Sequence, residues 1–127
     1  MEIYTGGRSQ GKLGYVLAKK GYGMDVVLEA SLLNTPADLA GYKVINHFHE
    51  FTKKYADQPD IINNMAEIFI KEIKEIIIIS DQVGGGIVPL DMTERKWREL
   101  HGRTMCRLAG NASHVERVIF GIGQVIK

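Results

Sequence analysis

The sequence predicts an α/β fold: a mostly parallel five-stranded sheet with helices on both faces. Three observations lead to this class. Short β-rich runs alternate with helical periodicities along the chain. The four isoleucines at 76–79 are apolar throughout, as expected of a strand covered on both faces. Glycine-rich loops follow two of the strand ends. At 127 residues and 45% hydrophobic content, we expect one domain over 1–127.

The first strand is expected at 2–7, where an apolar run stops at glycines. Residues 11–23 then predict a helix, because Leu13, Val16 and Leu17 recur on one face and glycines end the pattern. Further strands are expected at 25–30 and 42–48, separated by a loop that contains a proline. The end of the 42–48 segment has a helix as its alternative.

The second half of the chain predicts a short helix at 51–59 and a longer one at 60–75, with Asp60 as its cap. A strand at 75–80 is followed by a glycine-rich loop and then by a helix. Asp91 and Glu94 have capping-box spacing for this helix, which reaches about residue 109. Its inner face is marked by Trp97, Leu100, Thr104 and Leu108. The last strand is expected at 117–127.

The loop between the first strand and the first helix has the spacing of a phosphate-binding loop. Gly6, four residues, Gly11 and Lys12 stand where backbone amides must approach phosphate oxygens and a lysine must reach the outer phosphates. This spacing predicts a P-loop nucleoside-triphosphate-binding fold. The alternative is that the glycines form a tight turn and nothing more. The nucleotide-binding candidates are Gly6, Gly7, Arg8, Ser9, Gln10, Gly11, Lys12 and Leu13.

Leu13 replaces the serine or threonine that normally binds Mg²⁺ in such a loop. Mg²⁺ must then be held from elsewhere or not at all. Ser9, inside the loop, and Asp81, at the end of the isoleucine strand, are the candidate ligands. Asp81, together with Glu29, is also expected to orient the metal or the attacking hydroxyl, while Lys12 stabilises charge between the β- and γ-phosphates.

Two histidines, His47 and His49, would share a face if the third strand continued past residue 48. Three roles stay open for them: a polar strand end, a phosphate or guanylyl acceptor, or a metal site.

The C-terminal third carries the most specific pattern. It contains Ser80-Asp81-Gln82-Val83-Gly84, Gly86-Ile87-Val88-Pro89, Gly102-Arg103 through Arg107-Leu108-Ala109, and Gly121-Ile122-Gly123 through Ile126-Lys127. This part resembles the adenosylcobinamide kinase / adenosylcobinamide-phosphate guanylyltransferase family of cobalamin biosynthesis. The loop departs from the family pattern at Leu13, and the segment with the family's guanylylated histidine has no clear counterpart.

The resemblance implies a compact, shortened relative that binds ATP or GTP, with Mg²⁺, and phosphorylates a corrinoid, cobinamide. By resemblance, Lys12, Asp81 and His47 are the catalytic candidates, and Glu29 and Arg103 join the loop in nucleotide binding. His47 would be the residue guanylylated if that second activity survives. A homo-oligomer, a trimer, is implied as well. The rival hypothesis is a non-catalytic nucleotide-binding protein that has lost Mg²⁺-dependent phosphoryl transfer.

Composition also limits which classes of partner and which cellular compartment we expect. A net charge of +1 gives no reason to expect nucleic acid. The longest apolar run is too short for a membrane span. The single cysteine, Cys106, and the lack of a signal-peptide pattern lead us to expect a cytoplasmic protein.

Overall fold

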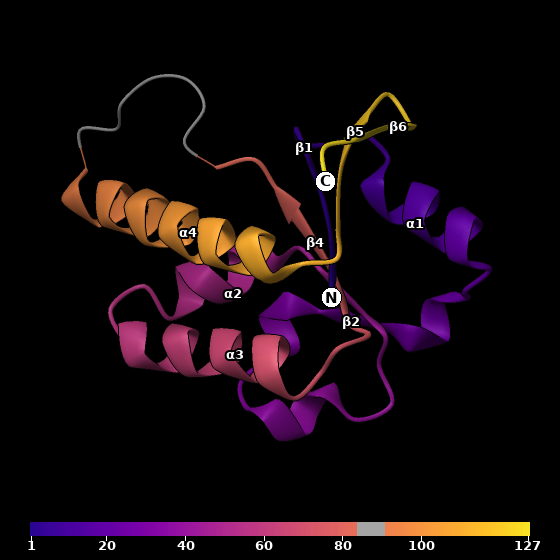
Figure 1. The fold of residues 1–127 in the computed structure, drawn as a ribbon. Coiled ribbons are helices and arrows are strands. Elements are labelled where there is room, and N and C mark those ends of the chain that lie inside the picture. The colour runs from indigo at the N-terminus through magenta and orange to yellow at the C-terminus, as the bar shows by residue number, and fades with distance from the viewer. Residues whose placement is uncertain (84–90) are drawn as a thin grey trace.

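The computed structural model describes residues 1–83 and 91–127. They form a six-stranded sheet with α1 on one face and α2, α3 and α4 on the other (Figure 1). The strand order is β2-β3-β4-β1-β5-β6, and all neighbours are parallel except β5 and β6. The strands are β1 Glu2–Gly6, β2 Val27–Glu29, β3 Val44–Asn46, β4 Ile77–Asp81, β5 His114–Ile119 and β6 Ile122–Val125.

The helices are α1 Lys12–Lys20, α2 Phe48–Lys54, α3 Pro59–Lys71 and α4 Met92–Asn111. Short 3-10 turns at Met24–Val26, Ala30–Leu32 and Pro36–Leu39 fill the stretches around β2. No helix within the described ranges is both long and apolar enough to cross a membrane.

The α/β class with a mostly parallel sheet is confirmed, but the expected strand at 117–127 is wrong as a single strand. The chain reverses at Phe120 and Gly121, whose φ angles are 51° and 74°, so that β6 runs antiparallel to β5. Two central residues with positive φ are typical of the tight hairpin turn that matches strand twist. The sheet therefore has six strands where five were expected.

Two expected boundaries are also wrong. The third strand ends at Asn46, because His47 takes a left-handed conformation with φ 56° and α2 begins at Phe48. Asp60 is not a helix cap: α3 begins at Pro59, whose fixed φ suits the first helical position. The expected cap of α4 is confirmed, since the Asp91 carboxylate accepts a hydrogen bond from the Thr93 amide at 2.8 Å.

Alternation along β1 divides the core into two layers. Ile3 pairs with Ile78 and Val115 and faces the α2–α4 side, whereas Tyr4 faces the α1 side with Val16 and Ile79. The α2–α4 layer is the larger of the two. Both layers contain β-branched strand residues packed on helix stripes, the arrangement expected of parallel strands buried on both faces.

A buried carboxylate ties α1 to the C-terminal hairpin. Glu116 on β5 is 1% exposed and lies 2.6 Å from Lys19 Nζ and 2.6 Å from His114 Nε2, and it also accepts a hydrogen bond from the Tyr15 hydroxyl. Burial alone would raise the pKa of Glu116, but the hydrogen bonds from Lys19, Tyr15 and His114 outweigh it and lower the pKa to about 2. The carboxylate therefore remains charged at neutral pH and anchors α1 against the sheet.

Candidate functional site

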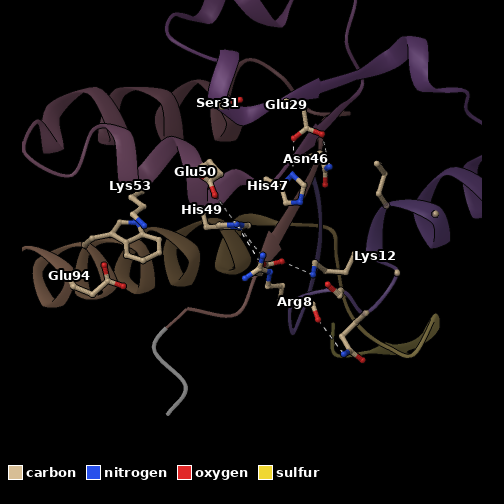
Figure 2. Close-up of a pocket in the computed structure, with 17 residues that line it drawn as sticks. Arg8, Lys12, Glu29, Ser31, Asn46, His47, His49, Glu50, Lys53 and Glu94 are labelled. Atoms are coloured by element: carbon tan, nitrogen blue, oxygen red, sulfur yellow. Dashed lines mark hydrogen bonds and ion pairs between the residues drawn. The ribbon is translucent and has the colours of Figure 1, made fainter. Parts of the chain in front are cut away.

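A cleft of about 890 Å³ opens beyond the carboxyl ends of the parallel strands, where open α/β sheets bind ligands. Side chains enter it from the loop after β1, from the ends of β2, β3 and β4, and from α2 and α4 (Figure 2). Strand order brings these segments together, because β1 lies next to β4 and β4 next to β3.

The loop over residues 7–11 has the backbone that phosphate contact requires. Gly6 could carry no Cβ, because that atom would collide with the carbonyl oxygen of Val118 on β5. Gly11 caps α1 with φ 80°, and Ser9 has φ 59°. The loop therefore turns sharply from β1 into the N-terminus of α1, whose free amides and dipole favour an anion.

Lys12 lies across the inside of this loop. Its side chain is 7% exposed, and its Nζ donates to the Gly7 carbonyl at 2.8 Å and lies 2.7 Å from Asp81 Oδ1. Figure 2 shows it reaching the cleft from the side opposite Lys53 and Glu94. The ammonium group is thus fixed between the loop and the end of β4, at the wall of the cleft.

His49 holds Asp81 from the other side. Its Nδ1 accepts a hydrogen bond from the Asp81 amide at 3.1 Å, and its Nε2 lies 3.5 Å from Asp81 Oδ2 and 3.7 Å from Glu50. Burial lowers the pKa of the His49 imidazole, although Asp81 and Glu50 act to raise it. A neutral ring with its proton on Nε2 satisfies both contacts, so His49 orients the carboxylate without adding a charge.

Glu29, Asn46 and His47 form a second group at the ends of β2 and β3. The Asn46 amide donates to Glu29 Oε1 at 2.8 Å, and His47 Nδ1 lies 2.8 Å from Glu29 Oε2. The carboxylate engages Nδ1 and so leaves Nε2 as the nitrogen of His47 available for chemistry. The rings of His47 and His49 meet edge to face, 5.6 Å apart.

A buried polar chain lies beneath the cleft. The Thr52 hydroxyl accepts from Trp97 Nε1 at 3.0 Å and lies 2.8 Å from His101 Nδ1, and His101 Nε2 lies 3.2 Å from Ser80 Oγ. Burial lowers the pKa of His101 to about 4, with His49 adding to the effect. This neutral chain links α2 and α4 to the residue that precedes Asp81.

The structure brings most of the expected site residues together. Arg8, Ser9, Gln10, Gly11, Lys12, Leu13, Glu29, His47 and Asp81 all line the cleft, while Gly6 and Gly7 shape the loop behind it. Arg103 does not join them: it lines a separate surface groove between α3 and α4. The Gly84 and Gly86-Ile87-Val88-Pro89 parts of the C-terminal pattern lie outside the described residues.

Sequence reasoning did not single out Asn46, Lys53 and Trp97 as cleft residues, and it left the role of His49 open. Lys53 Nζ lies 5.0 Å from the Trp97 ring, which is largely buried yet reaches the cleft wall. The sequence gives no sign of this contact, because Lys53 and Trp97 are 44 residues apart in the chain.

The donor set partly fits Mg²⁺. Protein-bound Mg²⁺ prefers carboxylate oxygens supplemented by substrate phosphates and water. Asp81 offers such an oxygen in the cleft, Ser9 offers a hydroxyl from the loop, and Leu13 offers none. No cluster of three or more His, Cys, Asp or Glu side chains suited to a metal occurs within residues 1–83 and 91–127. A metal here would therefore depend on the phosphates for most of its ligands.

The family model described as "Cobinamide kinase / cobinamide phosphate guanyltransferase" matches residues 23–126. The chain belongs to this family. Two bifunctional adenosylcobalamin biosynthesis proteins are similar to it. The protein from Salmonella typhimurium is 34% identical over 77 residues, which cover 58% of this chain and 42% of the relative. The protein from Escherichia coli is 38% identical over 53 residues, which cover 42% of this chain and 29% of the relative.

The chain therefore spans less than half the length of the curated relatives it matches. Within the cobinamide kinase / guanyltransferase family, the match begins after the loop of Gly6–Lys12 and includes the histidines of the middle segment. The resemblance seen in the C-terminal third is confirmed and extends further toward the N-terminus. The loop of Gly6–Lys12 lies outside the matched residues, and its phosphate-binding role stays a prediction.

Proposed function

We propose that the protein is a nucleotide-dependent kinase of cobalamin biosynthesis that transfers a phosphoryl group from ATP or GTP to a hydroxyl of cobinamide. One observation carries the proposal: Lys12 Nζ is fixed 2.8 Å from the Gly7 carbonyl and 2.7 Å from Asp81 Oδ1, inside a glycine loop at the sheet's carboxyl edge. Membership of the family supports the corrinoid as the acceptor. A single domain in the cytoplasm, as expected from the sequence, belongs to the same proposal.

Phosphoryl transfer asks for positioning and charge stabilisation more than for covalent chemistry. The loop amides and the N-terminus of α1 hold the triphosphate. Lys12 neutralises charge that develops as the bond between the β- and γ-phosphates breaks. Asp81 fixes Lys12 before the nucleotide arrives and afterwards orients the metal beside the attacking hydroxyl. His49 keeps Asp81 in place through the bond at 3.1 Å.

When bound with the nucleotide, Mg²⁺ would further neutralise the phosphate oxygens. Asp81 is the protein ligand we assign to it, with Ser9 as the hydroxyl that takes over from the one lost at Leu13. Asp81 also pairs with Lys12 through Oδ1. This arrangement therefore leaves Oδ2 as the oxygen that would bind the metal.

The cleft accommodates the acceptor in part. Its volume of about 890 Å³ is at the upper end of ordinary small-molecule sites. A triphosphate and a hydroxyl-bearing side chain fit this space, whereas a corrinoid ring has to rest outside. The end with Lys53 and Glu94, opposite Lys12, is the side from which we expect the acceptor to enter (Figure 2).

Guanylyl transfer is a second candidate function, favoured by the contact between Glu29 and His47. In its neutral form, a histidine with Nδ1 held by a carboxylate has the Nε2 lone pair free to attack an α-phosphate and release pyrophosphate. Incubation with α-labelled GTP should then give an acid-labile adduct that is lost in His47→Ala and retained in His49→Ala. Absence of an adduct would remove this activity and leave the kinase proposal intact.

The kinase proposal is tested with purified protein, cobinamide and γ-labelled ATP or GTP. We expect phosphorylated cobinamide that depends on Mg²⁺ and is lost in Lys12→Ala. Arg103→Ala is the matched control, since this residue lies outside the cleft. Nucleotide binding without Mg²⁺ and without transfer to cobinamide would instead establish the non-catalytic alternative.

The homo-oligomer expected by resemblance, a trimer, is also part of the proposal. The exposed apolar residues of the C-terminal hairpin and tail, Ile122, Val125 and Ile126, support it, since an apolar edge strand favours pairing with another chain. Light scattering coupled to size exclusion measures the mass directly. A monomer at micromolar concentration would rule it out.

A further inference from the structure

Phe120 is an apolar side chain in an unusual place. It is 83% exposed at the turn between β5 and β6, and its φ of 51° lies in the left-handed region that bulky residues rarely adopt. Asparagine, aspartate or glycine would suit this backbone and this exposure better. An exposed ring on a strained turn points to a role outside the protein's own core.

The turn that carries Phe120 is bonded to the phosphate loop. The Phe120 amide donates to Gln10 Oε1 at 3.0 Å, and the Gly121 amide donates to the Gln10 carbonyl at 2.8 Å. Gln10 also donates through Nε2 to the Arg8 carbonyl at 3.3 Å. The loop and the turn are thus one hydrogen-bonded unit, which fixes the base of the ring relative to any phosphate in the loop. Figure 1 shows the hairpin beside the start of α1.

The direction of the bound nucleotide follows from the strand order. Glu29, His47 and Asp81, the groups suited to chemistry, stand on β2, β3 and β4 or directly after them, all on one side of β1. β5 lies on the other side of β1. In the kinase reaction, a triphosphate whose γ-phosphate lies at Lys12 and Asp81 therefore has the turn after β5 on the side toward which its nucleoside can extend.

We propose that Phe120 stacks on the base of the bound purine nucleotide and supplies the affinity that distinguishes a nucleotide from bare triphosphate. Stacking on an aromatic ring tolerates either purine, because each base has a π-face. This inference rests on the proposed function, since it requires the loop to hold phosphate. The alternative is that the exposed ring packs against a second copy of the chain, and the test below distinguishes the two.

The test compares dissociation constants of the full chain for GTP, ATP and inorganic tripolyphosphate, measured by calorimetry. We use Phe120→Asn, which tolerates the left-handed backbone, and Phe120→Trp, which keeps a stacking ring. In Phe120→Asn we expect roughly tenfold weaker binding of both nucleotides and unchanged binding of tripolyphosphate. Phe120→Trp should bind nucleotides at least as tightly as the wild type, with its added fluorescence changed by GTP and unaffected by tripolyphosphate.

Gln124→Ala is the matched control, since Gln124 is exposed on the same hairpin and belongs to neither the loop nor the apolar edge. It should bind all three ligands like the wild type. Equal nucleotide affinity in Phe120→Asn would overturn the proposal. Equally weakened binding of tripolyphosphate would also overturn it, because it would mean that the loop is distorted. A change in oligomer mass would overturn it too, because it would assign the ring to a contact between chains. If the wild type binds neither GTP nor tripolyphosphate, the proposed function itself fails.

Discussion

His49 contacts Asp81 twice: its Nδ1 accepts from the Asp81 amide at 3.1 Å, and its Nε2 lies 3.5 Å from the Asp81 carboxylate. Protonation of Nδ1 would break the first contact. Because burial lowers the pKa of His49, the neutral ring persists below the pH at which an ordinary histidine titrates. The orientation of Asp81 should therefore survive mild acid.

We expect His49→Ala to lower kcat for phosphoryl transfer by about tenfold, with little change in nucleotide affinity, because the ring acts through Asp81. His49→Asn, whose amide oxygen can accept the same hydrogen bond, should recover part of the rate. Steady-state kinetics between pH 5 and 8 provide the check. In the wild type, the acid limb of the kcat profile should lie below the usual histidine range, and His49→Asn should lack it. Equal losses in the two variants would contradict a positioning role.

The pairing of Lys12 with Asp81 makes a second prediction. Without nucleotide, the Asp81 carboxylate competes with phosphate for the ammonium group. Asp81→Asn keeps the shape and removes the competing charge. We expect it to bind nucleotide several-fold more tightly in the absence of Mg²⁺ and to lose phosphoryl transfer. Calorimetry with EDTA measures the first effect, and labelled transfer to cobinamide measures the second. Weaker Mg²⁺-free binding in Asp81→Asn would show that the two residues do not compete.

Leu13 can be tested by restoring the missing hydroxyl. Its side chain is partly buried against the α1 side of the sheet while also lining the cleft, so Leu13→Thr removes some apolar packing and adds a metal ligand. We expect a free energy of unfolding lower by about 1 kcal/mol and stronger Mg²⁺ dependence of nucleotide affinity. Leu13→Val separates the two effects, because it loses packing without gaining an oxygen. The same Mg²⁺ response in both variants would show that the hydroxyl is not used.

His101 predicts an acid-sensitive step in stability. Its folded pKa of about 4 lies below the ordinary 6.5, so the unfolded state binds the extra proton first. Stability is thus fully present above pH 6.5 and is lost as the pH falls from 6.5 toward 4, by at most about 3 kcal/mol. Urea unfolding at pH 7.5, 5.5 and 4.5 measures the slope. His101→Gln should be less stable at pH 7.5 and show a flatter decline. Parallel curves for the two proteins would assign the loss to other groups.

Gly123 is required by the close approach of α1 to the hairpin. A Cβ at this position would collide with the Glu116 carboxylate and the Tyr15 hydroxyl. We expect Gly123→Ala to lower the free energy of unfolding by about 1–3 kcal/mol, because both partners are tied to other groups and cannot move freely. Gly110→Ala is the control, since its Cβ meets open space on α4, and it should stabilise by about 0.5–1 kcal/mol. Equal stability of the two variants in denaturant titrations would contradict this packing.

Local patterns were enough to predict the parallel sheet and part of the cleft. The carboxyl ends of parallel strands lie at one edge of the sheet, so the sequence alone predicts Glu29 and Asp81 near the glycine loop. The direction of the His49 side chain could not be predicted. It depends on the left-handed backbone conformation of His47, a position where no glycine indicates a turn. The hairpin was missed for a similar reason. Its turn needs two residues with positive φ, and only Gly121 is of a type that commonly adopts such a φ, whereas Phe120 is not.

Contacts between distant parts of the chain were beyond sequence reasoning altogether. Gln10 bonds to a turn 110 residues later, and Trp97 bonds to Thr52 on another helix. Arg103 shows the opposite case: the sequence suggested that it joins the loop, and the structure places it elsewhere. A motif shared with the family made it a nucleotide-binding candidate, whereas the position of α4 directs it into a groove away from the cleft.

The central place of β1 has a consequence for how the protein is made. Glu2 pairs with Ile77 on one side and with His114 on the other, so β1 must wait for two strands that follow it much later in the chain. The amides that fix Gln10 belong to Phe120 and Gly121, and Phe120 lies 110 residues further along the chain. Such distant pairings slow folding, because long loops must close before any contact stabilises them. The glycine loop can therefore reach its final arrangement only after β5 and the turn at Phe120 have formed.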